Sequence, residues 1–271
     1  MRMTPAVLNL LIINVLLLAA SYVLGTSSLG IDLDKWLGLH YITASDFGVW
    51  QFVSFIFMHS GFSHLFFNMF ALWMFGTVIE NSLGTQKFVI YYLVCGIGSG
   101  IVQEIAMAID INPLIAAVDQ TMSDTSFENV NAFVQHHVVA FSSDSKVLIT
   151  SFLNSYNGVV NSSPSEAAAL AREFLPKYQE MYINTQNTVG ASGAVFGILL
   201  AFGMLFPNMR IMLMIPPIPM KAKWFVIIYG LIELFCGIHG ADYDNVAHWA
   251  HLGGMLFGFL LLKYWKVQRI Y

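Results

Sequence analysis

The sequence predicts an all-α membrane protein in which six transmembrane helices form one bundle and a long extracytoplasmic insertion separates the third helix from the fourth. Composition is the first reason, because 57% of the 271 residues are hydrophobic and only 10% are charged. Soluble domains carry about 25% charged residues. The second reason is that the charged residues gather between long apolar runs, as expected for loops that connect membrane spans.

Six apolar stretches are expected to cross the hydrocarbon layer of the bilayer, which is roughly 30 Å thick. They cover residues 5–24, 50–79, 88–108, 191–206, 222–240 and 246–265. The first stretch follows Arg2 and also fits a secretory signal peptide. We expect an uncleaved span there, because the stretch has the length of a full crossing and five more follow.

The basic residues predict the orientation of the bundle. With six spans both termini lie on one side, and the loops of that side hold most of the Lys and Arg residues. Because positively charged loops stay in the cytoplasm, we expect cytoplasmic termini in a multi-pass protein of the cell membrane, either plasma or inner. The basic residues on that side are Arg2, Lys87, Arg210, Lys221, Lys223, Lys263, Lys266 and Arg269.

Residues 110–186 form the expected insertion, which is too long for an ordinary connection within a bundle. Ser163-Pro164-Ser165-Glu166 offers an N-cap, a proline at the first helical position and a capping-box glutamate. Apolar residues then follow at helical spacing. The insertion is therefore expected to be partly helical, with one amphipathic surface helix that is kinked at Pro176.

Charge and cysteine usage exclude several classes of protein. The net charge is −4 and no basic stripe with interleaved aromatic residues occurs, so nucleic acid is not an expected partner. Both cysteines, Cys95 and Cys236, lie in apolar runs, which argues against a disulfide framework or a cysteine-based metal site. The expected partner at this point is the lipid bilayer.

Ser192 is the candidate nucleophile. It lies in Gly190-Ala191-Ser192-Gly193, at the boundary between a polar loop and the fourth span. Backbone N–H groups in the first turn of a helix have no partner within the helix, so they can stabilise an oxyanion. Taken alone, the motif also fits close packing of small residues between membrane helices.

His251 is the candidate base, since a serine hydroxyl becomes an effective nucleophile only when a base removes its proton. It shares one helical face with Gly254 and Gly258, and Gly193 and Gly197 form a similar strip on the fourth span. These two small-residue faces predict contact between the spans. The alternative is a glycine packing face whose histidine merely finds a hydrogen bond.

The second span is predicted to supply oxyanion donors. His64 and Asn68 are spaced i, i+4 on one face, and both side chains can donate hydrogen bonds beside the Ser192 N–H. Nucleophile, base and donors from three helices favour catalysis over coincidence.

No carboxylate stands at an obvious position to orient His251, because Asp242 and Asp244 in the preceding loop are expected to be solvated. The prediction is therefore a Ser–His dyad, in which Phe196 packs against the imidazole in place of an acid. Glu80 and Glu233 lie within spans, and we expect each to be structural, with a partner inside the bundle.

These motifs, their order and the six-span layout resemble the rhomboid family of intramembrane serine proteases. The matching pieces are Trp50 to Gly76, with Met58-His59 and His64-x-x-x-Asn68, then Gly190 to Gly197, and Ala250 to Gly254. The resemblance covers the chain apart from the insertion, which implies a single rhomboid-like membrane domain over residues 1–271.

The resemblance implies a serine-type endopeptidase that cleaves transmembrane or membrane-proximal segments of single-span membrane proteins. Its catalytic cavity would open to the extracytoplasmic side, and no cofactor or metal is implied. The family commonly has a tyrosine at the position of Phe196, so stacking is kept here and a hydroxyl is lost. The implicated residues are Ser192 and His251 in catalysis, His64, Asn68 and the Ser192 N–H in the oxyanion site, and Gly190, Phe196 and His59 in support.

Three other interpretations account for part of this pattern. A proteolytically inactive rhomboid-like protein that binds membrane clients is the main alternative, although such proteins usually lack the serine or the histidine. A membrane transporter with a polar midplane is a second. A zinc protease built from His59, His64, His248 and His251 is a third, and it lacks the His-Glu-x-x-His arrangement in which a glutamate activates metal-bound water.

Overall fold

The computed structural model describes residues 2–27, 30–212, 219–240 and 246–269. The chain divides into two compact units. Unit 1 comprises Met1–Leu39, Gly48–Ile105 and Thr188–Tyr271, and unit 2 comprises His40–Phe47 and Ala106–Asn187. Helix α6 (Thr85–Ser123) contributes its first part to unit 1 and its last part to unit 2. The two-residue strands β1 (Leu39–His40) and β2 (Asn187–Thr188) lie where the chain passes from one unit to the other.

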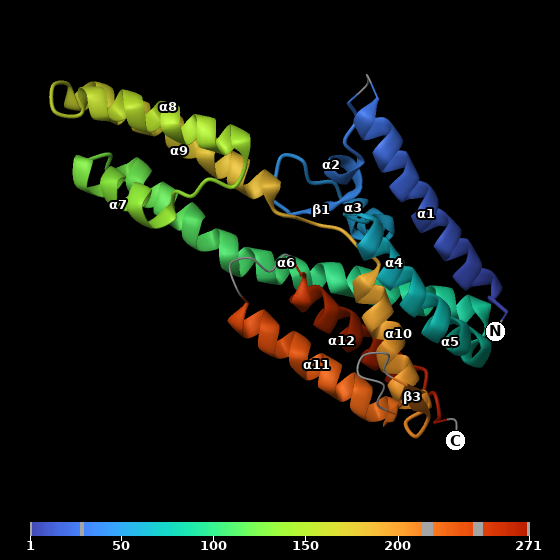
Figure 1. Cartoon of the computed structure of the whole chain (residues 1–271). Coiled ribbons are helices and arrows are strands. Elements are labelled where there is room, and N and C mark those ends of the chain that lie inside the picture. The colour runs from blue at the N-terminus through green and yellow to red at the C-terminus, as the bar shows by residue number, and fades with distance from the viewer. Residues whose placement is uncertain (1, 28–29, 213–218, 241–245, 270–271) are drawn as a thin grey trace. The chain divides into compact units, whose positions relative to one another are not determined.

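Unit 1 is a bundle of apolar helices that begins with α1 (Pro5–Thr26) and ends with α12 (His248–Tyr264) (Figure 1). A short antiparallel pair, β3 (Arg210–Met212) with β4 (Pro219–Lys221), precedes α11. The remaining elements are α2 (Leu33–Leu37), α3 (Gln51–Ser54), the 3₁₀ turn η1 (Phe55–Phe57), α4 (Phe62–Ala71), the π-helical turn η2 (Leu72–Gly76), α5 (Thr77–Leu83), α10 (Ser192–Leu205) and α11 (Ala222–His239).

Four of the described helical segments are long and apolar enough to cross a membrane. They are Pro5–Thr26, Phe62–Leu83, Thr85–Ser123 and Ala222–His239. Helix α10, with 14 residues, is apolar but shorter, and α12 has 17 residues. A helix needs about 20 residues, within a range of roughly 17–25, to cross the hydrocarbon layer, and four of the six expected spans are both long and apolar enough.

Glu80 fixes the start of α1. Its Oε1 accepts hydrogen bonds from the backbone N–H of Ala6 at 3.0 Å and from Thr85 Oγ1 at 2.8 Å, and its Oε2 accepts from the N–H of Val7 at 3.0 Å. The first N–H groups of a helix have no partner within the helix, and an anion there is also favoured by the helix dipole. Glu80, which is 2% exposed, therefore has the partner in the bundle that its position within a span requires.

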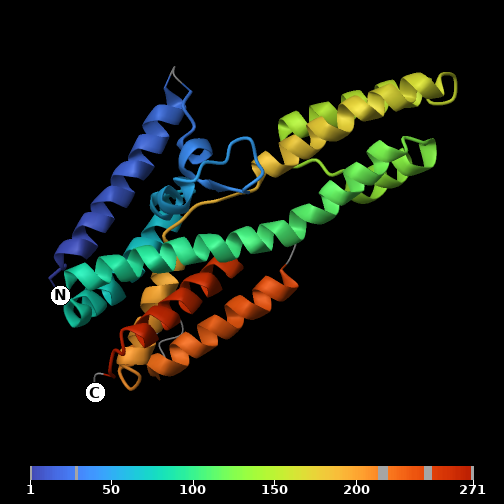
Figure 2. The same cartoon turned by 180° about the vertical axis from the view of Figure 1, so that it is seen from behind.

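Helices α10 and α12 touch through their backbones, and α11 packs beside both (Figures 1 and 2). A side chain added at Gly254 would collide with the backbone carbonyl of Gly193, so neither helix could approach the other so closely with larger residues. The hydroxyl of Tyr91 on α6 donates to the carbonyl of Gly197 at 2.8 Å. The predicted contact between the two small-residue faces is thus confirmed.

Unit 2 has a hydrophobic core of its own. Helices α8 (Ser143–Val159) and α9 (Pro164–Thr185) pack against each other (Figure 2), with Phe152 stacked on Phe174 at a centroid distance of 4.0 Å. The buried Tyr178 hydroxyl donates to the carbonyl of His137 at 2.9 Å and accepts from the N–H of Val139 at 3.0 Å. These bonds tie the end of α7 (Phe127–His137) to α9.

Two expectations for residues 110–186 differ from the structure. One amphipathic helix was expected, but α6 continues to Ser123, and α7 and α8 precede α9. The capping box at Ser163 is also absent, because the Ser163 side chain makes no capping hydrogen bond and its ψ of 82° lies outside the extended range typical of N-caps. Ser142 caps α8 instead, in a reciprocal pair with Ser145. Helix α9 continues through Pro176.

Candidate active site

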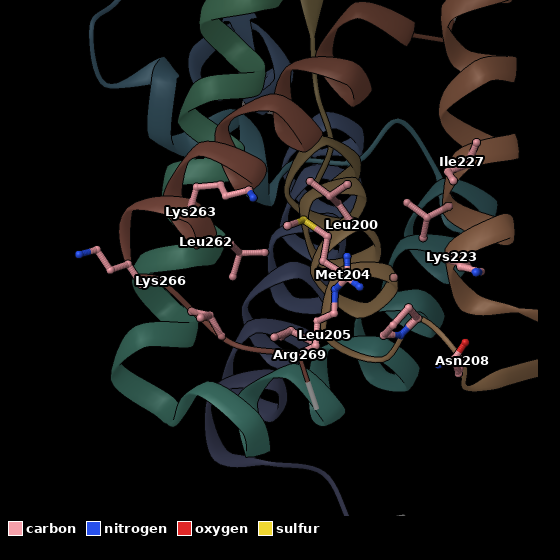
Figure 3. A pocket seen from close by; sticks show the side chains of 14 residues that line it. Leu200, Met204, Leu205, Asn208, Lys223, Ile227, Leu262, Lys263, Lys266 and Arg269 are labelled. Carbon is pink, nitrogen blue, oxygen red and sulfur yellow. The ribbon is translucent and has the colours of Figure 1, made fainter. Parts of the chain in front are cut away.

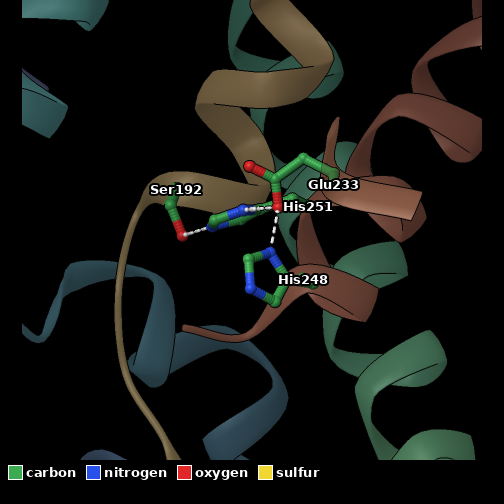
Figure 4. Close-up of polar contacts among 4 residues, drawn as sticks. All are labelled: Ser192, Glu233, His248 and His251. Atoms are coloured by element: carbon green, nitrogen blue, oxygen red, sulfur yellow. Dashed lines mark hydrogen bonds and ion pairs between the residues drawn. The ribbon is translucent and has the colours of Figure 1, made fainter. Parts of the chain in front are cut away.

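Ser192 and His251 are in direct contact (Figure 4). Ser192 is the first residue of α10, and His251 lies in the first turn of α12, where it is only 7% exposed. The distance between Ser192 Oγ and His251 Nε2 is 2.8 Å, which is that of a well-formed hydrogen bond. The backbone contact between α10 and α12 thus brings together two side chains that lie 59 residues apart in the sequence.

Glu233 lies on the other side of the imidazole. Its Oε2 is 2.8 Å from His251 Nδ1, and this carboxylate is 6% exposed. A carboxylate accepts hydrogen bonds, so the proton of a neutral His251 resides on Nδ1 and Nε2 carries the lone pair. This tautomer can accept the proton of the Ser192 hydroxyl, as a general base must.

The same carboxylate oxygen also binds a second histidine. Glu233 Oε2 is 2.6 Å from His248 Nδ1 (Figure 4), so α11 is linked to two residues in the first turn of the helix that holds His251. The rings of His248 and His251 lie 6.3 Å apart and nearly perpendicular. His248 therefore shares the orienting group of His251, while the serine contacts His251.

The expectation that no carboxylate orients His251 is therefore wrong. Asp242 and Asp244, which were considered for that role, lie outside the described residues. Glu233 was expected to be structural with a partner inside the bundle, and that partner is His251, 18 residues later and on another helix. One signal was available, since a glutamate inside an apolar span must have a partner, and two histidines open the next span.

Phe196 also holds the His251 ring. It lies one turn after Ser192 on α10, and the two rings are stacked with centroids 4.2 Å apart and planes at 8°. A face-to-face contact of this kind fixes the plane of the imidazole, while Glu233 fixes its rotation within that plane. The predicted packing of Phe196 against the imidazole is observed, but together with the acid that it was expected to replace.

Gly190 allows the loop before Ser192 to pass close to His64. Its φ of +137° is a conformation that residues with a side chain rarely adopt, and its N–H donates to the carbonyl of Phe55 at 2.9 Å. An added Cβ would lie 2.9 Å from His64 Nε2 and 3.6 Å from Ser192 Oγ. His64 Nε2 and Ser192 Oγ therefore both lie close to Gly190.

The other face of His64 is held by polar and aromatic neighbours. Ser60 Oγ is 3.1 Å from His64 Nδ1. When this hydroxyl donates to Nδ1, the ring proton resides on Nε2, the nitrogen nearest Gly190. His59, which is 2% exposed, packs edge-on against His64 with centroids 5.0 Å apart, so it supports the ring by packing.

Asn68 is hydrogen-bonded to His64. It lies one turn after His64 and its Nδ2 donates to the His64 backbone carbonyl at 3.0 Å. An amide has two N–H groups, so one remains for another acceptor. The structure thus brings Ser192, His251, His64 and Gly190 together directly and joins Asn68 to the group through His64.

The residues that could hold a metal are not the four histidines considered above. Within the described part of the chain, Glu233, His248 and His251 have potential ligand atoms within 4.8 Å of one another. The contacts from Glu233 to the two Nδ1 atoms, 2.6 and 2.8 Å, have the lengths of charge-assisted hydrogen bonds. The arrangement therefore suits shared protons without a metal.

An apolar helical bundle that holds a Ser–His–Glu array between three of its helices defines an integral membrane protein with a candidate serine hydrolase site. The family model of the Rhomboid domain matches residues 46–110 and 166–266, which make up more than half of the chain. The chain belongs to the rhomboid family. Residues 111–165, which lie within the expected insertion, fall between the two matched parts.

Individual relatives match over shorter stretches. The chain is 33% identical over 69 residues to Rhomboid protease GlpG of Salmonella choleraesuis, which is 26% of this chain and 25% of that relative. It is 32% identical over the same length to the proteins of that name from Salmonella newport and Salmonella heidelberg. The matched stretch thus spans about a quarter of the length of these relatives.

Proposed function

We propose that this chain is an intramembrane serine endopeptidase that cleaves transmembrane or membrane-proximal segments of single-span membrane proteins. The observation that carries the proposal is the 2.8 Å contact between Ser192 Oγ and His251 Nε2 inside an apolar bundle. Membership of the rhomboid family supports it, as does the local similarity to proteins named rhomboid proteases.

In the proposed reaction His251 Nε2 takes the proton of the Ser192 hydroxyl while Oγ attacks the scissile carbonyl carbon. The resulting imidazolium lies 2.8 Å from Glu233 Oε2, so the carboxylate stabilises the charge as it develops. His251 then gives the proton to the leaving amine, and water releases the acyl group by the same steps in reverse order. Glu233 is a positioning residue in this scheme, because it acts through His251.

The oxyanion of the tetrahedral intermediate would be held by the Ser192 N–H and by His64 Nε2, with the second N–H of Asn68 as a further donor. Each donor of this kind typically lowers the barrier by about 3 kcal/mol. The close approach of Gly190 to His64 Nε2 supports the assignment, because it leaves His64 beside the serine with no side chain between them. Phe196 and His59 support the two rings.

The proposed topology has six crossings, with α10 and α12 spanning the membrane as well as the four longer segments. The distribution of Lys and Arg favours cytoplasmic termini and an extracytoplasmic position for residues 110–186 in a plasma or inner membrane. Substrates would be single-span proteins whose helix unfolds locally to reach Ser192.

Cleavage of a generic transmembrane substrate by the purified protein tests the proposal. We expect Ser192→Ala and His251→Ala to abolish cleavage, and Ser192→Ala to abolish covalent labelling by a fluorophosphonate. Ser82→Ala is the matched control, because the Ser82 hydroxyl bonds only to its own helix at Val78. Cleavage that persists in both active-site variants would refute the assignment of Ser192 and His251.

The main alternative is a rhomboid-like protein that binds membrane clients without cutting them. This alternative predicts that the protein can be crosslinked to a transmembrane client, that no cleavage product forms, and that Ser192 is not labelled by a fluorophosphonate. A zinc protease would lose activity in a chelator and keep it in Ser192→Ala, and a transporter would show solute flux that survives Ser192→Ala.

A further inference from the structure

A cavity of about 720 Å³ lies at one end of unit 1, between the last turns of α10, the first turns of α11 and the end of α12 (Figure 3). Its volume falls within the roughly 300–1,000 Å³ of ligand sites. The cavity is separate from the Ser192 site, which lies at the opposite ends of α10 and α12. The proposed function makes no use of it.

The cavity combines apolar walls with a basic margin. Leu200 and Met204 of α10 form part of the wall, while Lys223 of α11 and Lys263 of α12 flank it from opposite sides (Figure 3). The Arg269 side chain runs up toward Met204, and Lys266 extends outward from the edge (Figure 3). Four cationic side chains thus surround one apolar space.

These cations have no anionic partner among the described residues. No Asp or Glu lines the cavity, and the ion pairs within the described ranges involve other side chains. Lys223 and Lys263 lie over the rings of Trp224 and Phe259, at 5.3 and 5.5 Å from the centroids. Such contacts steady an ammonium group without neutralising it, so no described residue balances the positive charge of the cavity.

We infer that the cavity binds an anionic phospholipid, with the phosphate at the basic margin and part of an acyl chain against the apolar wall. Basic pockets between transmembrane helices are suited to anionic lipid head groups. Helix α11 is long and apolar enough to cross a membrane, so its first turn is at head-group depth. A free phosphate would leave the apolar wall without a contact. A zwitterionic lipid would place its own cationic group beside the four cationic side chains, which is unfavourable.

Native mass spectrometry of the purified protein with phosphatidylglycerol or phosphatidylcholine tests the inference. Wild type should retain phosphatidylglycerol selectively. Each cation near a head group contributes about fivefold in affinity, so the triple variant Lys223→Gln, Lys263→Gln, Arg269→Gln should lose roughly 100-fold. The matched control is Lys87→Gln, Arg210→Gln, Lys221→Gln, which removes the same charges from basic residues outside the cavity lining and should keep the lipid.

A second variant separates the cavity from general surface charge. Met204→Trp fills part of the cavity beside the apolar wall without changing any charge. This variant should also weaken retention of phosphatidylglycerol. Equal losses in the two triple variants would overturn the inference, since they would indicate only attraction to the surface. Displacement of the lipid by millimolar inorganic phosphate, or equal retention of phosphatidylcholine, would overturn it as well.

Discussion

Replacing Glu233 by Gln should slow the proposed reaction while leaving substrate binding almost unchanged. The side chain keeps its size and can still accept a hydrogen bond through its amide oxygen, so both histidines retain a neighbour of the same shape. The negative charge is lost, and an amide nitrogen that turned toward His251 Nδ1 would favour the tautomer with its proton on Nε2. That tautomer cannot take the Ser192 proton.

The magnitude follows from the contact between Glu233 Oε2 and His251 Nδ1. A hydrogen bond to a charged group contributes about 1.5–3 kcal/mol, and each 1.36 kcal/mol of barrier changes a rate tenfold. The bond strengthens when His251 becomes an imidazolium, so its loss raises the barrier without weakening the ground-state complex. We expect kcat to fall about 10- to 150-fold and KM to stay within about threefold.

Steady-state cleavage of a fluorogenic transmembrane substrate gives kcat and KM separately, and the rate of fluorophosphonate labelling reports the reactivity of Ser192 without a peptide substrate. Glu80→Gln is the matched control, since Glu80 is also a buried glutamate within a span but bonds to the start of α1. It should lower thermal stability by about 1–2 kcal/mol and leave kcat unchanged. A Glu233→Gln enzyme with wild-type kcat and labelling rate would refute the positioning role.

Three further predictions concern packing. Gly254→Ala should lower stability by about 1–3 kcal/mol and abolish most activity, because the new methyl meets a backbone carbonyl of α10. Thermal melting and cleavage assays measure both effects. The control Gly230→Ala should change neither, because its methyl meets only a flexible methionine. Phe196→Leu should reduce kcat about 2- to 12-fold through loss of ring stacking worth roughly 0.5–1.5 kcal/mol, and an unchanged kcat would contradict this. Phe174→Ala should destabilise unit 2 by about 3–5 kcal/mol, seen as faster limited proteolysis within residues 106–187, whereas the exposed Phe127→Ala should not.

The contact between the nucleophile and the base could be predicted from the sequence, and the reason is specific. Glycines at regular helical spacing beside both Ser192 and His251 favoured close packing of these two helical faces against each other. The structure has that packing, with Gly254 against Gly193. Local spacing was informative here because the feature that drives the contact lies on the same helical faces as the reactive groups.

The role of Glu233 could not be predicted in the same way. Its partners lie on α12, and the loop between α11 and α12 determines which residues of the two helices face each other. A periodic pattern along one helix contains no information on that alignment. The sequence could indicate only that a carboxylate within an apolar span needs a partner.

The helices of residues 110–186 were underestimated for a different reason. The stretch that follows the third span is less apolar, so hydropathy gave no sign that α6 continues to Ser123 through Pro113. The core of unit 2 is formed by aliphatic and aromatic residues from α6, α7, α8 and α9, such as Leu114, Phe133, Phe152 and Phe174. Their mutual packing appears only when the helices are placed together.

The anchoring of α1 by Glu80 suggests a way to take the bundle apart and rebuild it. If residues 2–27 were supplied as a separate peptide to a chain that lacks them, only one docking position would present the N–H groups of Ala6 and Val7 to the two carboxylate oxygens. A shift of a single residue would leave an ionised oxygen without its donor in apolar surroundings. Split-protein complementation by that peptide should therefore depend on Glu80 and tolerate no change of register.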